Sequence, residues 1–84
     1  MRQIEIYGLA GSDALKAAEE FCVKAKYSHA MRPIEGHDFN RSEYERVREF
    51  DGALPQLFIG TEQIGSLHDL MSLKPYIVQQ KISG

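Results

Sequence analysis

The stretch that decides the fold is residues 53–73, with the sequence ALPQLFIGTEQIGSLHDLMSL. It holds a short apolar run, residues 57–59, between Pro55 and Gly60, which is typical of a buried strand. Gly60 can adopt the positive φ that a two-residue hairpin turn requires, so the chain is expected to reverse and continue as a strand through 63–64. Ser66 and Asp69 have the spacing of a helix-capping pair. The stretch therefore predicts a strand, a hairpin, a second strand that ends at a glycine, and a helix.

This order of residues resembles the C-terminal half of glutaredoxins, in which a Pro-Gln-(Ile/Leu)-Phe-Ile-Gly strand and a hairpin precede Ile-Gly-(Gly/Ser)-x-x-Asp-Leu. The resemblance implies a cis proline whose preceding residue pairs, through its backbone, with the cysteinyl part of glutathione. It also implies that the first turn of the following helix holds the γ-glutamyl carboxylate and that its aspartate accepts the γ-glutamyl ammonium. The positions that it assigns to this groove are Ser12, Leu54, Pro55, Gly65, Ser66, His68 and Asp69.

These residues also have a purely structural interpretation, which is compatible with ligand binding. Ser66 and Asp69 can be explained simply as helix caps. A cis proline at position 55 can fix the path of the chain whether or not a ligand binds.

The rest of the chain supplies further elements. Alternating residues 3–7 predict a first strand, and Ser12 or Asp13 can cap a helix that continues to about Lys26. Residues 27–34 suit a second strand of modest or edge character because Pro33 cannot donate a hydrogen bond. A capping pattern predicts another helix over 40–50. The predicted last helix is interrupted at 74–75, residues 76–78 add one turn, and residues 79–84 are expected to form a frayed tail.

The predicted order is β-α-β-α-β-β-α over a single domain, residues 1–84, with no repeat or linker. This is the thioredoxin-like order of glutaredoxins. The resemblance therefore covers nearly the whole chain and implies an α/β fold with a four-stranded mixed sheet flanked by three helices.

Composition excludes several classes of function. Of the 84 residues 26% are charged, and the net charge of −2 gives no basic surface for nucleic acid or for an anionic membrane. The chain has no apolar stretch long enough to span a membrane and no layout typical of a signal peptide, so a cytoplasmic location is expected. A single cysteine excludes an internal disulfide and any Cys-x-x-Cys motif. Three dispersed histidines make a metal site unexpected.

Glutaredoxins carry their catalytic thiols between the first strand and the first helix, where the helix N-terminus lowers the thiol pKa. Aligning the first strands places Ser12 at the nucleophilic cysteine and Leu15 at the resolving one. A serine hydroxyl is barely ionised near neutral pH and cannot exchange a disulfide or bind an iron–sulfur cluster as a thiolate does. Leu9 also stands where the family tends to have a lysine that helps bind the glycine carboxylate of glutathione. Ordinary thiol–disulfide oxidoreductase activity is therefore not expected.

Two side chains keep alternatives open. Cys22 lies on the apolar stripe of the first helix and is interpreted as a small buried hydrophobe, with a peripheral thiol open to glutathionylation as the alternative. Ser12 is interpreted as a helix N-cap. Its alternative is a hydroxyl that holds the glutathione thiolate, as in some glutathione transferases, although 84 residues leave no room for their second domain.

Three functions follow for testing. The leading one is a degenerate glutaredoxin that serves as a binding module for glutathione or a protein partner and requires no cofactor. The second is a glutathione-dependent redox protein that works through Cys22 or through the thiol of a partner. The third is a transferase-like activity that uses Ser12.

Overall fold

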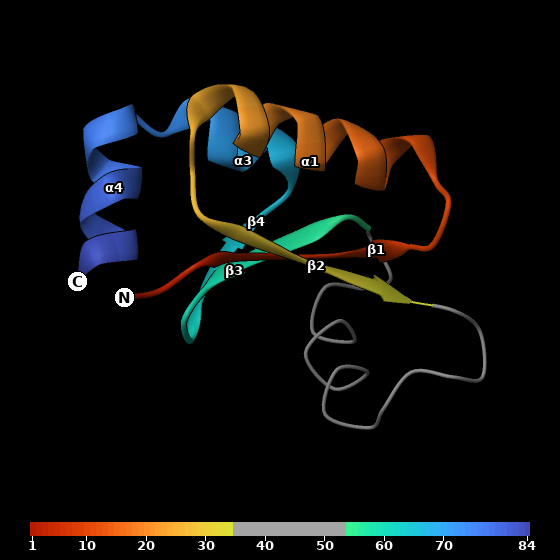
Figure 1. The fold of residues 1–84 in the computed structure, drawn as a ribbon, viewed down its shortest axis with the longest axis horizontal. Helices are drawn as coiled ribbons and strands as arrows, with labels where there is room; N and C mark the ends of the chain where they lie inside the picture. Colours follow the sequence, from red (N-terminus) through yellow and green to blue (C-terminus); the bar gives the residue numbers. More distant parts are fainter. Residues whose placement is uncertain (35–53) are drawn as a thin grey trace.

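The computed structural model describes residues 1–34 and 54–84, and Figure 1 shows their arrangement. Along the chain, the elements are β1 (Ile4–Leu9), α1 (Asp13–Ala25), β2 (His29–Ile34), β3 (Gln56–Ile59), β4 (Glu62–Gly65), α3 (Leu67–Ser72) and α4 (Pro75–Ser83). The predicted helix over 40–50 lies outside the described residues.

The four strands form one sheet in the order β2-β1-β3-β4. Strand β1 runs parallel to β2, whereas β1 with β3 and β3 with β4 are antiparallel. The described part of the chain is therefore an α/β structure with a four-stranded mixed sheet and three helices. This architecture is compatible with a thioredoxin-like layout.

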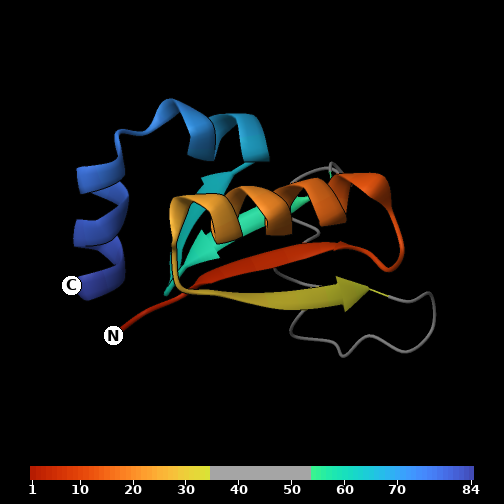
Figure 2. The same ribbon diagram turned by 45° about the horizontal axis from the view of Figure 1, so that its top comes forward.

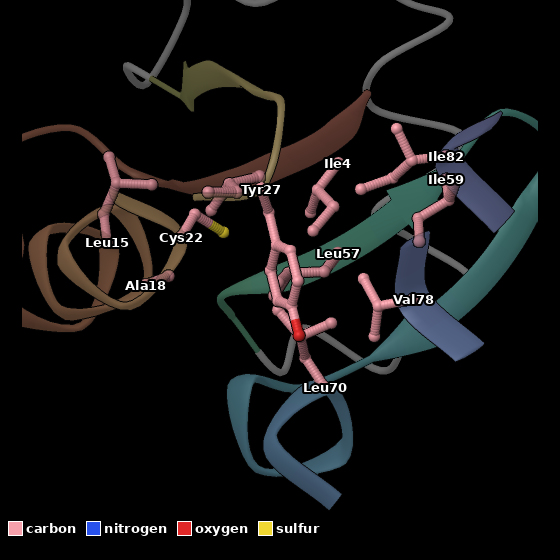
Figure 3. Close-up of a cluster of buried hydrophobic side chains, with 11 residues drawn as sticks. Ile4, Leu15, Ala18, Cys22, Tyr27, Leu57, Ile59, Leu70, Val78 and Ile82 are labelled. Atoms are coloured by element: carbon pink, nitrogen blue, oxygen red, sulfur yellow. The ribbon is translucent and has the colours of Figure 1, made fainter. Parts of the chain in front are cut away.

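One face of the sheet carries the main core. Helices α1 and α3 lie over this face, and α4 closes one end of it (Figures 1 and 2). Alternation along β1 sends Ile4 and Ile6 into the core, while Tyr7 lies on the opposite face and meets Phe58 edge to face with ring centroids 5.5 Å apart. Figure 3 shows how the three helices contribute to the same cluster. Its buried members are Ile4, Ile6, Leu15, Ala18, Cys22, Tyr27, Leu57, Ile59, Leu70, Val78 and Ile82.

The local signals in the sequence are confirmed at several positions. Helix α1 starts at the predicted cap, Ser12, and ends at Lys26, which has φ 60°. The predicted hairpin turns at Gly60, with φ 62°, and Ile59 pairs with Glu62 across a two-residue turn. Strand β2, which contains Pro33, lies at the edge of the sheet, as expected.

The prediction for the C-terminal residues is wrong. Instead of one extra turn and a frayed tail, residues 75–83 form the nine-residue helix α4. Pro75 starts this helix, and Val78 and Ile82, four residues apart, are buried at 0% and 2% exposure. The backbone amide of Arg2 donates to the Ile82 carbonyl over 2.7 Å, so α4 is tied to the start of β1.

Candidate functional site

Three segments that the sequence singled out lie at the same end of the sheet. Strand β1 ends there, and β3, which is antiparallel to β1, begins there. Strand β4 is antiparallel to β3, so it also ends there, and leads into α3. Because Tyr7 pairs with Gln56, Leu54 and Pro55 follow on beside the end of β1 and the loop to Ser12. Because Leu57 pairs with Gly65, Ser66 follows on the other side of β3. Figure 2 shows α1 and α3 over the same face of the sheet.

Ser12 is the N-cap residue of α1. Its side-chain oxygen accepts a hydrogen bond from the Leu15 amide at 3.2 Å, and its own amide donates to the Leu9 carbonyl at 3.0 Å. The residue has extended backbone angles, φ −76° and ψ 149°, which are those of an N-cap. The hydroxyl therefore lies at the positive end of the thirteen-residue helix, where a negative charge would be stabilised.

Leu15, which the resemblance aligns with a resolving thiol, is a core residue. It is only 7% exposed and packs against Gly8 of β1. A Cβ on Gly8 would lie 2.9 Å from Leu15 Cδ1 and 3.2 Å from Leu15 Cβ, so a larger residue at position 8 would force Leu15 to shift. Sequence reasoning did not single out Gly8. Its place one residue after the alternating run was the only local signal.

Leu54 and Pro55 lie beside the loop that leads to Ser12, because Gln56 pairs with Tyr7 near the end of β1. The peptide bond between them is cis, as the resemblance implies. The Leu54 side chain packs against Tyr7, Ile34 and Phe58 on the face opposite α1, and both Leu54 and Pro55 keep part of their surface exposed. Their backbone thus lies next to the end of β1, at the end of the sheet where α1 and α3 begin.

The start of α3 is organised by a reciprocal capping box. The Asp69 amide donates to Ser66 Oγ at 3.2 Å, while Asp69 Oδ2 accepts from the Ser66 amide at 2.9 Å and from Ser66 Oγ at 3.1 Å. These hydrogen bonds from Ser66, the backbone amide first, lower the pKa of the Asp69 carboxyl below its usual 3.8. The carboxylate is exposed and therefore carries a negative charge at this end of the sheet at neutral pH.

Gly65 makes the box possible. It has φ 110°, and a Cβ at this position would overlap the Asp69 carboxylate. His68, which follows Ser66 in the first turn, has an exposed side chain. Of the six positions in this half of the chain that the resemblance assigns to the groove, Gly65, Ser66, His68 and Asp69 thus lie at the junction of β4 and α3.

Cys22 lies away from this end of the sheet, inside the core. The side chain is 0% exposed, and Figure 3 shows its sulfur among buried apolar residues. Burial raises the pKa of the Cys22 thiol from 9.0 to about 11. The thiolate is the reactive form of cysteine, so the fraction available at neutral pH is about one in 10,000. The interpretation of Cys22 as a small buried hydrophobe agrees with this environment.

The described residues, 1–34 and 54–84, contain no group of three or more histidine, cysteine or carboxylate side chains placed to hold a metal ion. No helix in these two ranges is long and apolar enough to cross a membrane. A scan of the chain against protein-family models and a search of curated proteins each gave no match.

Proposed function

We propose that the chain is a glutaredoxin-like domain of the thioredoxin-like class that has lost its catalytic thiols and acts as a binding module. Its ligand is a small thiol peptide of the glutathione class, held in the groove between the Ser12 loop, Leu54–Pro55 and the start of α3. The alternative occupant of the same groove is a segment of a protein partner. A cytoplasmic location stays a prediction from the sequence.

The observation that carries this proposal is the strand register. It brings three segments that lie far apart in the sequence to one end of the sheet. Leu54 keeps part of its surface exposed, and its backbone would pair with an extended peptide in the way a strand edge does. Ser12 and Asp69 add a hydroxyl and a carboxylate on either side, so peptide-like and ammonium groups have partners.

The chemistry of the same residues disfavours thiol–disulfide exchange. Exchange begins with a thiolate attacking a disulfide sulfur. The chain has one cysteine, and that thiol is buried in the core with a pKa of about 11. The Ser12 hydroxyl serves as a cap for the Leu15 amide, a role that needs no ionisation. A redox role would therefore need a thiol from a partner.

Leu9 indicates that glutathione binds weakly. It ends β1 beside the groove and is 55% exposed, so it offers an apolar side chain where a lysine would attract the glycine carboxylate. We therefore expect an affinity for reduced glutathione in the millimolar range. Leu9→Lys is expected to tighten binding by up to about fivefold, because a nearby exposed opposite charge contributes up to about 1 kcal/mol.

The test is an amide NMR titration with reduced glutathione. Saturable shifts confined to 9–13, 54–56 and 65–69 support the proposal. Val23→Lys is the matched control, because Val23 is an apolar residue on α1 with 59% exposure and the same change of charge there leaves the affinity unchanged. Absence of saturable shifts for both the parent protein and Leu9→Lys would exclude glutathione and leave the protein partner as the occupant to pursue.

A transferase-like role predicts a different result. Conjugation of glutathione to an electrophile should then occur and should be lost in Ser12→Ala. If Ser12 acts only as a helix cap, Ser12→Ala should lower the stability of the protein, and neither the parent protein nor the variant should catalyse conjugation.

A further inference from the structure

A second hollow lies at the end of the sheet opposite the candidate groove. Figure 1 shows the start of the chain, the β3–β4 turn and the end of α4 at this end of the molecule, away from the loop before α1. The pocket has a volume of about 140 Å³ and is lined by Arg2, Ile59, Thr61, Glu62 and Lys81. Side chains from three segments therefore line one space: the residues before β1, the hairpin turn and the last turn of α4.

Arg2 is held in place by its backbone and by the turn. Its amide donates to the Ile82 carbonyl over 2.7 Å. Its side chain lies against Gly60 so closely that a Cβ there would be 2.8 Å from Arg2 Cδ and Nε. Arg2 Nη1 lies 3.7 Å from the position of a Cβ on Gly84, so the guanidinium reaches toward the end of α4. Gly60 thus serves both the turn, through its positive φ, and the placement of Arg2.

The charges on the pocket wall leave a positive excess. Lys81 Nζ and Glu62 Oε2 form an ion pair at 2.5 Å, which joins α4 to β4. Among residues 1–34 and 54–84, no carboxylate forms an ion pair with the Arg2 guanidinium. Two cations against one carboxylate give the lining side chains a net charge of +1. The Thr61 hydroxyl adds a neutral donor beside them.

We propose that this pocket binds a phosphate group, either as the free ion or as a monoester. The planar guanidinium of Arg2 suits bidentate contact with phosphate oxygens, and an ammonium and a hydroxyl complete the set of donors. A volume of about 140 Å³ accommodates a group of this size. Glu62 holds Lys81 in position but also repels an incoming anion, so the site is weak. It is independent of the glutathione groove, which lies at the other end of the sheet.

The test is an amide NMR titration with inorganic phosphate at constant ionic strength set with chloride. We expect saturable shifts at Arg2, Thr61, Glu62 and Lys81. Arg2→Gln should weaken binding about tenfold, since it removes a charge-assisted pair of hydrogen bonds. Glu62→Gln should tighten binding severalfold because it removes the repelling charge. A merely structural Glu62–Lys81 pair gives no such gain.

Lys24→Gln is the matched control, because it removes the same charge from an exposed residue of α1 that does not line the pocket. It should leave the phosphate affinity unchanged. Arg2→Lys keeps the charge and guards against a variant that fails to fold, which the amide spectrum reports directly; it should retain part of the affinity. Methyl phosphate tells a monoester from the free ion by which of them binds more tightly.

Three results would overturn the proposal. They are the absence of saturation with both phosphate and methyl phosphate, equal shifts with acetate at the same concentration, and an unchanged affinity in a folded Arg2→Gln variant.

Discussion

Cys22 shows how position in the fold controls the chemistry of a single residue. Raising the thiol pKa from 9.0 to about 11 lowers the thiolate fraction at neutral pH about 100-fold, and complete burial adds a steric barrier. We therefore expect a disulfide reagent to label the native protein at least about 100-fold more slowly than the urea-unfolded protein at the same pH. Similar rates in the two states would mean that the thiol is accessible, and would reopen the redox alternative.

Ser12, at the N-terminal end of α1, is a position where the fold should lower the pKa of a thiol instead of raising it. A cysteine placed here would have its sulfur near the Leu15 amide and the positive end of the helix, both of which favour the thiolate. In a Cys22→Ala background, Ser12→Cys is expected to titrate well below the usual thiol pKa of about 8.5, as measured by thiolate absorbance. Ala17→Cys, at an exposed mid-helix position, is the control and should titrate near that usual value. Equal pKa values at both positions would contradict this account of the helix start.

At the scale of elements, α3 depends on its capping box for its start. Ser66 lowers the Asp69 pKa, so this carboxylate stabilises the fold above its usual pKa of 3.8, and that contribution is lost as the pH falls through the lower, folded value. Ser66→Ala should return the Asp69 pKa toward 3.8 in a carboxyl NMR titration and cost about 1 kcal/mol of stability in urea unfolding. Ser72→Ala is the control, because Ser72 Oγ donates to the His68 carbonyl and not to Asp69. An Asp69 pKa unmoved by Ser66→Ala would assign the shift to another cause.

How far the sequence predicts an element depends on whether its signals are local. The cap at Ser12, the turn at Gly60 and the box at Ser66 are short-range patterns, and each is found where it was predicted. Helix α4 was missed because its polar residues 79–81 look like a tail, whereas its burial depends on Val78 and Ile82 meeting the distant strands β1 and β3.

The site shows the same limit. No local pattern states that Pro55 lies beside the loop before Ser12, because that follows from the long-range register of β1 with β3. Only the resemblance to glutaredoxins assigns residues from these segments to one groove, and that assignment stays a prediction. Neither the resemblance nor the residue pattern predicted the close contact between Gly8 and Leu15.

At the scale of the whole molecule, α4 connects the two ends of the chain to the core. Ile82 is 2% exposed within the main cluster, near Ile4 and Ile59 in Figure 3, and its carbonyl accepts from the Arg2 amide. Ile82→Ala is therefore expected to cost about 2–5 kcal/mol in urea unfolding, the usual range for emptying a buried site. Tyr76→Ala on the same helix, where the side chain is 61% exposed, should change stability by no more than about 0.5 kcal/mol.

The contrast between these two variants decides what the C-terminal residues do. In a frayed tail, both substitutions would have similarly small effects, because neither side chain would be buried. In a docked helix, the loss at Ile82 also weakens the anchor of Arg2, whose guanidinium lines the proposed phosphate pocket. Ile82→Ala should then reduce phosphate affinity as well as stability, while Tyr76→Ala leaves both unchanged. A destabilised Ile82→Ala protein that keeps full phosphate affinity would separate the helix from the pocket and show that Arg2 is held by the hairpin turn alone.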